Sequence, residues 1–288
     1  MKRIFTIVAA SGDFSIIIPS WNNLPFLQKC IFSIRNHSAG KHQIIVHANE
    51  GSDGTLEWLQ SENILYTHSR DNIGICAAFN CALKRAEKQF VLYLNDDMYV
   101  LPGWDEALTQ VIPESSLWML SSTMIEPHES GNACVIVADY GDALASFRED
   151  DLLNEFAGLQ KNDWSGASWP PVLLPRQLWE SVGGFSEEYF PGMYSDPDLA
   201  MKLWQKGVRY FRGAGSSRVY HFQSKSTQRI LQNNGRLLFM KKWGVTPSFF
   251  YREYLQMGQP WRGASGKLPN FSRIWLNRLR VSVQTYFL

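Results

Sequence analysis

Asn95, Asp96 and Asp97 form a polar and acidic cluster that directly follows the apolar run 90–94. Apolar residues resume at 99–101, so the pattern predicts a buried strand that ends in concentrated negative charge. Adjacent carboxylates repel one another unless a cation or hydrogen bonds offset their charge. A divalent ion that holds a phosphate-bearing ligand would do this, because such ions prefer oxygen ligands. A solvated loop with a helix N-cap is the alternative, and this stretch alone leaves both open.

The elements that must position this cluster alternate between strand and helix over the first hundred residues. Such alternation predicts an α/β fold, with a mostly parallel sheet covered by helices on both faces. Because open sheets of this kind bind ligands at the carboxyl ends of their strands, the polar loops after the strands converge on one cleft. We expect strands at 14–19, 43–47, 63–68 and 90–94, and helices at 24–36, 55–61 and 74–88.

The second half of the chain predicts a smaller mixed sheet with short helices. The helix expected at 197–206 has Asp196 as a candidate N-cap, a proline in its first turn and Gly207 after its end. We expect further strands at 118–125, 133–138, 165–168, 172–175 and 218–221, and further helices at 151–159 and 176–182.

The composition narrows the class of protein. The 288 residues suffice for a large core, and 28 basic against 27 acidic residues indicate no broad surface for nucleic acid. The four cysteines lack metal-binding spacing and predict buried free thiols in a reducing compartment. The apolar run 4–10 is at the short limit for an export signal and the next apolar run belongs to the fold, so we expect no export. No segment approaches the ~20 apolar residues of a membrane span. We therefore expect a cytoplasmic protein.

The last part of the chain, residues 254–288, contains five arginines or lysines and no acidic residue. From Asn270 onward, apolar side chains share one helical face, which matches an amphipathic helix on an anionic surface at the inner face of the membrane. A helix packed on the protein's own core or on a second copy of the chain is the alternative, and the sequence leaves both open. The apolar residues are Phe271, Ile274, Trp275, Leu279, Val283 and Tyr286, with Arg273, Arg278 and Arg280 interspersed.

Six segments resemble, in the same order, the motifs of family 2 glycosyltransferases with the GT-A fold. The resemblance spans residues 14–227 and implies an inverting, metal-dependent enzyme of cell-surface glycan assembly. It implies one domain at 1–245, with a nucleotide-binding half at 1–112 and an acceptor-binding half at 113–245, and a helical extension at 246–288. The segments are IIIPSWNN (16–23), IIV and NEGSDGT (44–55), NIG and AAFN (72–80), NDD (95–97), GGFSEEYF and DPDL (183–199), and VYHF and SKST (219–227).

The resemblance implies that a Mn²⁺ or Mg²⁺ ion stabilises the departing diphosphate. Asp97 matches the last position of the Asp-x-Asp motif and is the expected metal ligand, with His221 completing the site. Asp96 would face the ribose or the same ion, and Asn95 replaces the usual first Asp. A buried histidine that ends a strand is the alternative for His221.

The resemblance also implies a base and an acceptor pocket. Asp196 matches the residue that takes the proton from the attacking hydroxyl, and a purely structural N-cap is its alternative. Ser195 stands where most relatives have Glu. Asp198, Gly166 and Trp169 are expected at the acceptor and sugar pocket, although Asp198, near the N-terminus of its helix, fits a structural role better. Trp169 either stacks on a sugar face or packs internally.

The nucleotide-sugar donor, a UDP-, GDP- or dTDP-sugar, is expected in the loops after the first three strands. Gly74 would allow it to approach the backbone closely. Phe79 stands where many relatives have Arg. The expected contacts are Pro19, Ser20, Asn49, Glu50, Arg70, Asn72, Gly74, Asn80, Asn95 and Asp96.

Two other functions compete with sugar transfer to a glycan or lipid-linked acceptor. A sugar-nucleotide pyrophosphorylase shares the broad fold but needs a Gly-rich loop with a basic residue after the first strand, which residues 19–22 do not provide. A non-catalytic module that binds a nucleotide sugar or a glycan is suggested by Ser195, Asn95 and Phe79. The presence of Asp97, Asp196 and His221 together argues against this module. The sequence leaves open whether the protein forms a homodimer.

Overall fold

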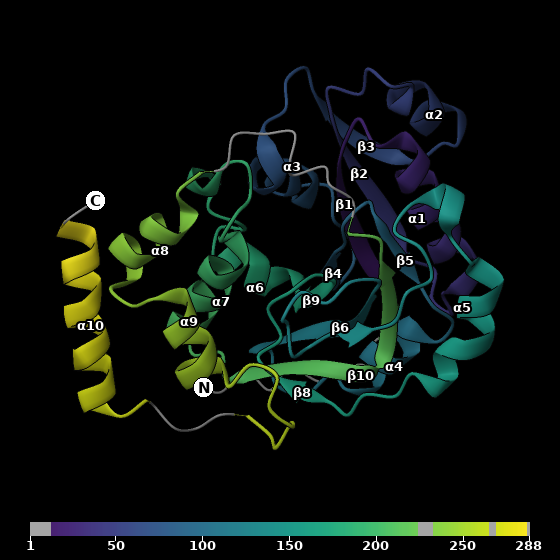
Figure 1. Ribbon diagram of the computed structural model, residues 1–288. Helices are drawn as coiled ribbons and strands as arrows, with labels where there is room; N and C mark the ends of the chain where they lie inside the picture. Colours follow the sequence, from purple (N-terminus) through teal and green to yellow (C-terminus); the bar gives the residue numbers. More distant parts are fainter. Residues whose placement is uncertain (1–12, 224–232, 265–268, 287–288) are drawn as a thin grey trace, which may run out of the picture.

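A single mixed sheet organises the structure, a computed structural model that describes residues 13–223, 233–264 and 269–286 (Figure 1). The apolar run 4–10 and the segment 224–227 lie outside these ranges. The strands are β1 (Phe14–Trp21), β2 (Gln43–Asn49), β3 (Leu65–Ser69), β4 (Phe90–Tyr93), β5 (Met98–Val100), β6 (Trp118–Glu126), β7 (Ile136–Val137), β8 (Trp164–Ser165), β9 (Val172–Pro175) and β10 (Tyr210–His221). The α-helices are α1 (Leu24–His37), α2 (Thr55–Ser61), α3 (Gly74–Leu83), α4 (Trp104–Gln110), α5 (Glu149–Glu155), α6 (Arg176–Ser181), α7 (Ser195–Gln205), α8 (Gly235–Trp243), α9 (Pro247–Phe249) and α10 (Phe271–Tyr286). Short 3₁₀ turns lie at Leu144–Ser146, Phe156–Gly158 and Glu187–Tyr189, and a π-helical turn at Phe250–Leu255.

The strand directions bring the ends of six strands to one edge of the sheet. The order is β3-β2-β1-β4-β9-β6-β10-β5. β1 is parallel to β2 and β4, and β2 is parallel to β3. β9 is antiparallel to both β4 and β6, so β6 runs parallel to β4, and β10 runs parallel to β6. The carboxyl ends of β1, β2, β3, β4, β6 and β10 therefore share one edge, as the sequence predicted for the first strands.

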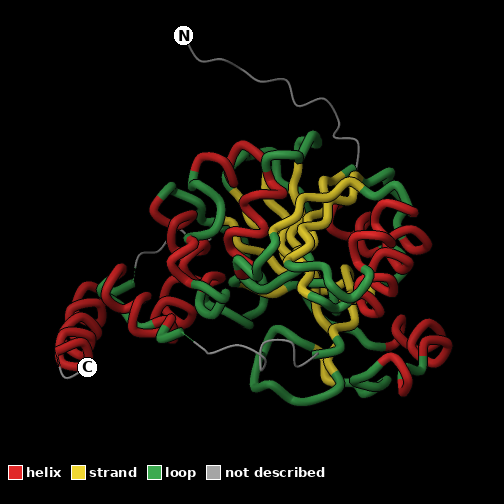
Figure 2. The backbone as a smooth tube through the Cα atoms, turned by 90° about the horizontal axis from the view of Figure 1, so that it is seen from above, coloured by secondary structure: helices red, strands yellow, loops and turns green. Residues whose placement is uncertain are grey.

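Alternating side chains of the central strands enter two hydrophobic cores, one on each face of the sheet. In β1, Ile16 and Ile18 pack on the face covered by α1, α2 and α4, while Ile17 packs on the face covered by α3, α6 and α7. Both faces are thus covered by helices, as Figure 2 shows from above. This arrangement explains the continuous apolar runs at 16–18 and 90–94, because a strand buried on both faces needs no polar alternation.

The elements predicted for the first hundred residues are confirmed, with shifted ends, and larger differences occur later. β10 begins at Tyr210, whereas the prediction began at 218. The missed part contains Gly213, where a side chain would collide with Trp164, since a Cβ there would lie 1.9 Å from the indole. Strand propensity is low for glycine, so packing against Trp164 determines this part of the strand. Neither α4 nor β5 was predicted, and of the strand expected at 133–138 only β7 forms.

The segment after α7 is part of one of the two cores. Val245, Phe249 and Leu255 share a hydrophobic cluster with Leu199 and Trp204 of α7. The predicted boundary between 245 and 246 falls inside this cluster, and the division into a domain and an extension stays a prediction. The last helix, α10, stands at one margin of the molecule (Figure 1).

The four cysteines are free thiols, as predicted, and Cys81 differs from the prediction in being partly exposed. Among the helices within the described ranges, none is long and apolar enough to cross a membrane.

Candidate functional site

The register of β5 against β10 brings His221 to the acidic cluster after β4. His221 pairs with Met98, the residue next to Asp97, so the two side chains face each other across the strands. The Nε2 atom of His221 lies 3.5 Å from Oδ2 of Asp97. Asp97 is 6% exposed, so this contact is largely removed from solvent. Two residues separated by more than a hundred positions thus meet at one edge of the sheet.

Glu126, the last residue of β6, completes this arrangement and was not predicted. Its Oε1 atom lies 2.9 Å from Nδ1 of His221, and Ser130 donates a hydrogen bond to its Oε2. Burial lowers the pKa of His221, but the charges of Asp97 and Glu126 outweigh burial and raise this pKa to about 10. The site therefore stabilises positive charge at the imidazole. The signal was present in the sequence, because Glu126 follows a buried apolar strand as Asp96 and Asp97 do.

Ser20 and Asp96, both expected at the nucleotide, contact each other. Ser20 lies at the end of β1 and donates a hydrogen bond of 2.7 Å to Oδ2 of Asp96. Both side chains are buried, and the neighbouring Asn95 is partly exposed. The loops after β1 and β4 are therefore joined at the strand edge, beside the pair formed by Asp97 and His221.

Asp196 lies in the first turn of α7, and the structure contradicts its interpretation as an N-cap. The cap residue is Tyr194, and no side chain forms a capping hydrogen bond at this helix end. Within the described ranges, no hydrogen bond or ion pair of the Asp196 carboxylate is found. The side chain keeps some exposure to solvent, yet it is surrounded by protein, and this desolvation raises the pKa of Asp196 to about 7. A carboxylic acid with this pKa exchanges protons near neutral pH.

Tyr93 connects Asp196 to the acidic cluster. It is the last residue of β4, and burial raises the pKa of its hydroxyl first, followed by the charges of Asp196, Asp97 and Asp96 among others. The three carboxylates therefore lie within electrostatic reach of one phenol. Asp96, Asp97 and Asp196, which the sequence predicted to lie in one site, are thus found in one region of the fold.

Asp198 lies inside the protein, which agrees with the structural role expected for it, and its contact with an acceptor stays a prediction. The side chain is fully buried. It accepts hydrogen bonds from Ser186 (2.6 Å) and Trp243 (2.8 Å), and it forms an ion pair of 2.9 Å with Lys242. Asp198 thus joins α7 to α8 and to the segment before Glu187.

Replacing Asp198 by alanine is expected to lower the free energy of unfolding by about 3–5 kcal/mol, because it breaks a buried pair and leaves donors without acceptors. Glu188→Ala is the matched control, since Glu188 pairs with the same Lys242 but is half exposed and should cost at most about 1 kcal/mol. Urea denaturation measures both. Equal losses in the two variants would contradict the structural role of Asp198.

Asn80 and Gly74 contact the segment 185–190 of the protein itself. The amide of Asn80 donates to the carbonyl of Phe185 (2.9 Å) and accepts from the Phe185 amide (2.9 Å). Gly74 has a φ of 76°, and a Cβ there would lie 2.7 Å from the ring of Phe190. The close approach that Gly74 permits is therefore made by the protein itself. Contact of either residue with a nucleotide stays a prediction.

The loops after β2 and β3 are organised by Asn49 and Asn72. The buried Asn49 accepts a hydrogen bond of 3.0 Å from the amide of Ile73, and Asn72 accepts one of 2.9 Å from the amide of Gly74. Glu50 has a φ of 60° and accepts a hydrogen bond from Asn22, which joins this loop to the end of β1. Asn49 thus shapes the loop, while the partly exposed Glu50 lies at its surface.

Two further predicted contacts lie at either side of these loops. Pro19 is buried within β1, where it is paired with His47, so only its backbone is close to the strand edge. Arg70 is exposed directly after β3. Their contacts with a nucleotide stay predictions.

Gly166 and Trp169 meet the segment after the π-helical turn. A Cβ on Gly166 would lie 2.7 Å from the Cα of Met257, so glycine is required by internal packing. The indole of Trp169 stacks on Tyr251 with ring centroids 6.0 Å apart and donates to Sδ of Met257 at 3.4 Å. Trp169 keeps partial exposure. The charge of Asp196 helps to raise the pKa of Tyr251, after burial, so Trp169 and Tyr251 lie near Asp196.

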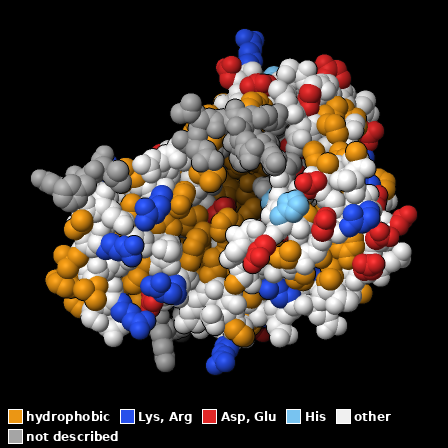
Figure 3. Space-filling model, viewed as in Figure 1, with side chains coloured by type: hydrophobic (Ala, Val, Ile, Leu, Met, Phe, Trp, Pro, Cys, Tyr) orange, Lys and Arg blue, Asp and Glu red, His pale blue; other side chains and the backbone are white. Residues whose placement is uncertain are grey.

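The space-filling view shows a hollow in the centre of one face, walled mainly by hydrophobic side chains and with an acidic side chain inside it (Figure 3). In the same view of Figure 1, the α7–α8 region lies on one side of this position and β10 with β5 lies on the other. The strands β10 and β5 and the helices α7 and α8 therefore border this position from different sides.

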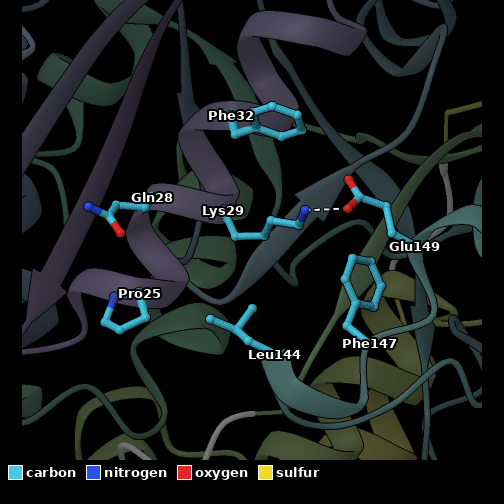
Figure 4. Close-up of a pocket in the computed structure, with 7 residues that line it drawn as sticks. All are labelled: Pro25, Gln28, Lys29, Phe32, Leu144, Phe147 and Glu149. Carbon is cyan, nitrogen blue, oxygen red and sulfur yellow. Dashed lines mark hydrogen bonds and ion pairs between the residues drawn. The ribbon is translucent and has the colours of Figure 1, made fainter.

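A separate shallow pocket of about 440 Å³ lies between α1 and residues 144–149 (Figure 4). Lys29 and Glu149 form an ion pair across it, and Glu149 also accepts a hydrogen bond of 2.6 Å from Tyr99. The polar groups of this pocket are thus paired with one another. The ion pair of Lys29 and Glu149 holds residues 144–149 against α1. None of the predicted site residues lines this pocket.

The residues at the strand edge fit a divalent ion that is shared with a ligand. Asp97 offers a carboxylate oxygen, and the converging Nε2 atom of His221 would become a ligand once an ion displaces its proton. The negative charges of Asp97 and Glu126 favour a cation here. Among the described residues, no three His, Cys, Asp or Glu side chains form a complete metal cage. Mg²⁺ and similar ions are often held by one or two side chains, with phosphates and water as the other ligands. An ion here would therefore be held jointly by the protein and a phosphate-bearing ligand.

Comparisons with known proteins find similarity to a family of glycosyl transferases, and the chain spans less than a quarter of the length of the first two relatives that it matches. Residues 15–117 match the family model described as glycosyl transferase family 2. The chain is 29% identical over 231 residues to the O-antigen biosynthesis protein RfbC of Myxococcus xanthus, a match that covers 76% of this chain and 18% of that protein. It is 25% identical over 255 residues to the GalNAc(5)-diNAcBac-PP-undecaprenol beta-1,3-glucosyltransferase of Campylobacter jejuni, covering 83% of this chain and 80% of that protein.

The fold has solved counterparts at lower sequence identity. The crystal structure of GalNAc-T7 with UDP, GalNAc and Mn²⁺ superposes with a TM-score of 0.55 at 14% identity, covering 83% of this chain and 46% of that one. At this identity the likeness concerns the fold alone. Residues 15–117 thus resemble glycosyl transferase family 2, and the sheet and helices of the chain have the GT-A fold.

Proposed function

We propose that this protein is an inverting glycosyltransferase that moves a sugar from a nucleoside-diphosphate sugar to a hydroxyl of a glycan or lipid-linked acceptor. The observation that carries the proposal is the convergence of Asp97, His221 and Asp196 around one strand edge in a chain that resembles this family. The three come from distant parts of the sequence and have different chemical roles available to them. A binding module would have no need of a carboxylate whose pKa is raised to about 7.

The donor is proposed to lie along the ends of β1, β2 and β4. Ser20 and Asp96 are already joined there by a hydrogen bond, and the buried Asn49 orders the next loop. The GT-A structure of GalNAc-T7 contains UDP, which makes a UDP-sugar the first donor to test.

The diphosphate is proposed to be held at Asp97 and His221 by Mn²⁺ or Mg²⁺. Such an ion acts as a Lewis acid that stabilises the negative charge of the departing diphosphate. Asp97 and His221 hold and orient it, and the hydrophobic walls of the hollow reduce the competition of water. The metal-containing GalNAc-T7 structure supports this choice of ion.

The acceptor hydroxyl is proposed to be deprotonated by Asp196. A carboxylate with a pKa of about 7 is largely ionised just above neutral pH and is still basic enough to accept a proton as the new bond forms. Asp198, the other carboxylate in the first turn of α7, is fully buried and paired with Lys242, so Asp196 is the carboxylate of this turn that can serve as a base. This supports direct attack, which inverts the anomeric carbon. The partly exposed Trp169 near Asp196 is proposed to contact a sugar ring. The similarity to an enzyme named for an undecaprenol-linked substrate makes a lipid-linked glycan the first acceptor to test.

Glu126 is proposed as a positioning residue for His221. By accepting a hydrogen bond from Nδ1, it fixes the ring orientation and directs Nε2 toward Asp97. Carboxylates that orient metal-binding histidines in this way typically contribute 10–100-fold to metal affinity.

Replacing Glu126 by glutamine is expected to weaken Mn²⁺ binding in the presence of UDP by about tenfold, and replacing it by alanine by up to about 100-fold. Glutamine keeps an acceptor oxygen, so it should retain part of the effect. Titration of Mn²⁺ followed by electron paramagnetic resonance measures both without any turnover. Unchanged Mn²⁺ affinity in the alanine variant would show that Glu126 does not act on the metal site.

The stereochemical part of the proposal has its own test. Product formed from an α-linked UDP-sugar should carry a β-linkage, as read by proton NMR of the anomeric signal. A retained α-linkage would contradict direct attack assisted by Asp196.

A further inference from the structure

α10 presents a row of large apolar side chains to solvent. Their exposed fractions range from 45% for Leu279 to 80% for Phe271. The row consists of Phe271, Trp275, Leu276, Leu279 and Val283. Figure 3 shows hydrophobic side chains at this margin of the molecule, with Lys and Arg side chains beside them. Contiguous exposed apolar surface of this kind marks an interaction site.

The opposite face of α10 is fixed to the protein, which corrects part of the predicted amphipathic face. Val281 is buried, and Ile274, predicted for the exposed face, packs against the core. Asn277 exchanges hydrogen bonds with Thr246, one of 2.9 Å and one of 3.3 Å. The alternative of packing on the protein therefore holds for one face of α10, while a second apolar face stays exposed and membrane binding stays a prediction. The side chain of Tyr286 lies outside the described part of the chain.

Arginines border the exposed row on both sides. At about 100° per residue, Arg273 and Arg280 lie along one side of it and Arg278 along the other. All three are exposed, and Arg273 also pairs with Glu253 at 3.0 Å. Residues 254–288 contain no acidic residue, and the exposed Lys241 on α8 adds to the positive charge nearby. The surface thus combines an apolar row with a cationic border.

We propose that α10 is a docking helix that lies in the plane of an anionic lipid bilayer. The apolar row would enter the boundary between headgroups and acyl chains, while the arginines extend to lipid phosphates. Trp275 stands in the row, and tryptophan favours this boundary. The proposal rests on the surface of α10 alone and not on the proposed catalytic function.

A second copy of the chain fits this surface less well. A two-fold interface pairs the same patch on both subunits, so the arginines that border one row would face those that border the other. No acidic residue of α10 is available to offset this repulsion. Charge complementarity therefore favours an anionic surface over self-association.

The test uses the full chain and sedimentation with vesicles, either of phosphatidylcholine alone or with one quarter phosphatidylglycerol. We expect binding to the anionic vesicles that is at least tenfold stronger than to neutral ones and that weakens at high salt. The double variant Trp275→Glu/Leu279→Glu should lose at least tenfold in affinity. Phe32→Glu is its matched control, because Phe32 is a half-exposed aromatic residue on another helix.

A second variant, Arg278→Glu/Arg280→Glu, tests the cationic border and does not depend on the apolar change. It should reduce binding to anionic vesicles only, whereas Lys84→Glu/Arg85→Glu, on exposed positions after α3, should leave binding unchanged. Thermal melts check that the variants are folded. The proposal is overturned if the wild-type chain does not bind anionic vesicles, or if the α10 variants bind as it does. Sedimentation equilibrium that shows a dimer broken by Trp275→Glu, without vesicle binding, would assign the row to a second copy instead.

Discussion

Asp196→Asn is expected to slow sugar transfer by about 10²–10⁴-fold and to leave binding of the nucleotide nearly unchanged. Asparagine has nearly the same shape but cannot accept the proton of the attacking hydroxyl. Turnover assays and calorimetric binding of UDP measure the two effects separately. Glu57→Gln, which changes an exposed acid on α2, is the control and should be neutral in both. Near-normal turnover in Asp196→Asn would remove Asp196 from the proposed mechanism.

The pH dependence adds a second test of the same residue. The pKa of Asp196 is raised to about 7, and only the ionised form is a base. The apparent kcat/KM of the wild-type protein should therefore fall about tenfold per unit below pH 7 and reach a plateau above it. A plateau that extends down to pH 5 would contradict the assignment.

The same pKa shift predicts that the asparagine variant is more stable than the wild type at neutral pH. The folded state raises the pKa of Asp196 from 3.8 to about 7, so protonation favours folding and stability is lost as pH rises between these values. Asparagine does not titrate, and the variant should gain about 1–3 kcal/mol of unfolding free energy at pH 8, with little difference near pH 4. Loss of an N-cap would give the opposite sign. Urea denaturation at the two pH values distinguishes them.

Asp97→Asn is the variant with the second large expected effect. Removing this charge should weaken Mn²⁺-dependent binding of UDP by at least about 100-fold and slow turnover by about 10³-fold, because the departing diphosphate loses its cation. Binding of UDP without metal should change little, since Ser20 and Asn49 stay in place. His221→Ala should act in the same direction.

Calorimetry with and without Mn²⁺ separates these contributions. The result that would contradict the metal site is a Mn²⁺ effect on UDP binding that is the same in Asp97→Asn and in the wild-type protein. In that case Asp97 would serve only the packing of β5 against β10, where its carbonyl accepts a hydrogen bond of 3.1 Å from Phe222.

The elements in the first half of the fold were predicted well, because strands buried on both faces appear in the sequence as short apolar runs. β1 and β4 are short apolar runs that end at polar residues, and each marks the strand edge directly. The search for apolar runs failed at the start of β10, because Arg212 and Gly213 give no strand signal. Packing of Gly213 against Trp164 determines the strand there. Tertiary packing of this kind is not visible in local propensity.

In the candidate site, too, the sequence predicted some features and tertiary packing determined others. The meeting of Asp97 with His221 was expected, but the reason lies in the pairing of His221 with Met98, which no local pattern reveals. A structural role was expected for Asp198, but its three partners lie in segments distant in sequence and were not predicted. Glu126 was missed because the predicted strand ended one residue too early. Polar residues that follow buried strands therefore indicate the position of the site in the sequence. The hydrogen-bond and ion-pair partners that surround a buried carboxylate are known only from the fold.

Release of nucleoside diphosphate from a panel of UDP-, GDP- and dTDP-sugars, with and without Mn²⁺, tests the central claim most directly. We expect at least one donor to be turned over by the wild-type protein only when the metal is present. We expect Asp97→Asn and Asp196→Asn to turn over that donor at least about 100-fold more slowly, with Mn²⁺-dependent nucleotide binding retained in Asp196→Asn alone. A protein that binds a nucleotide sugar tightly with Mn²⁺ but never releases the diphosphate, with any glycan or lipid-linked acceptor, would contradict transfer and identify a binding module instead.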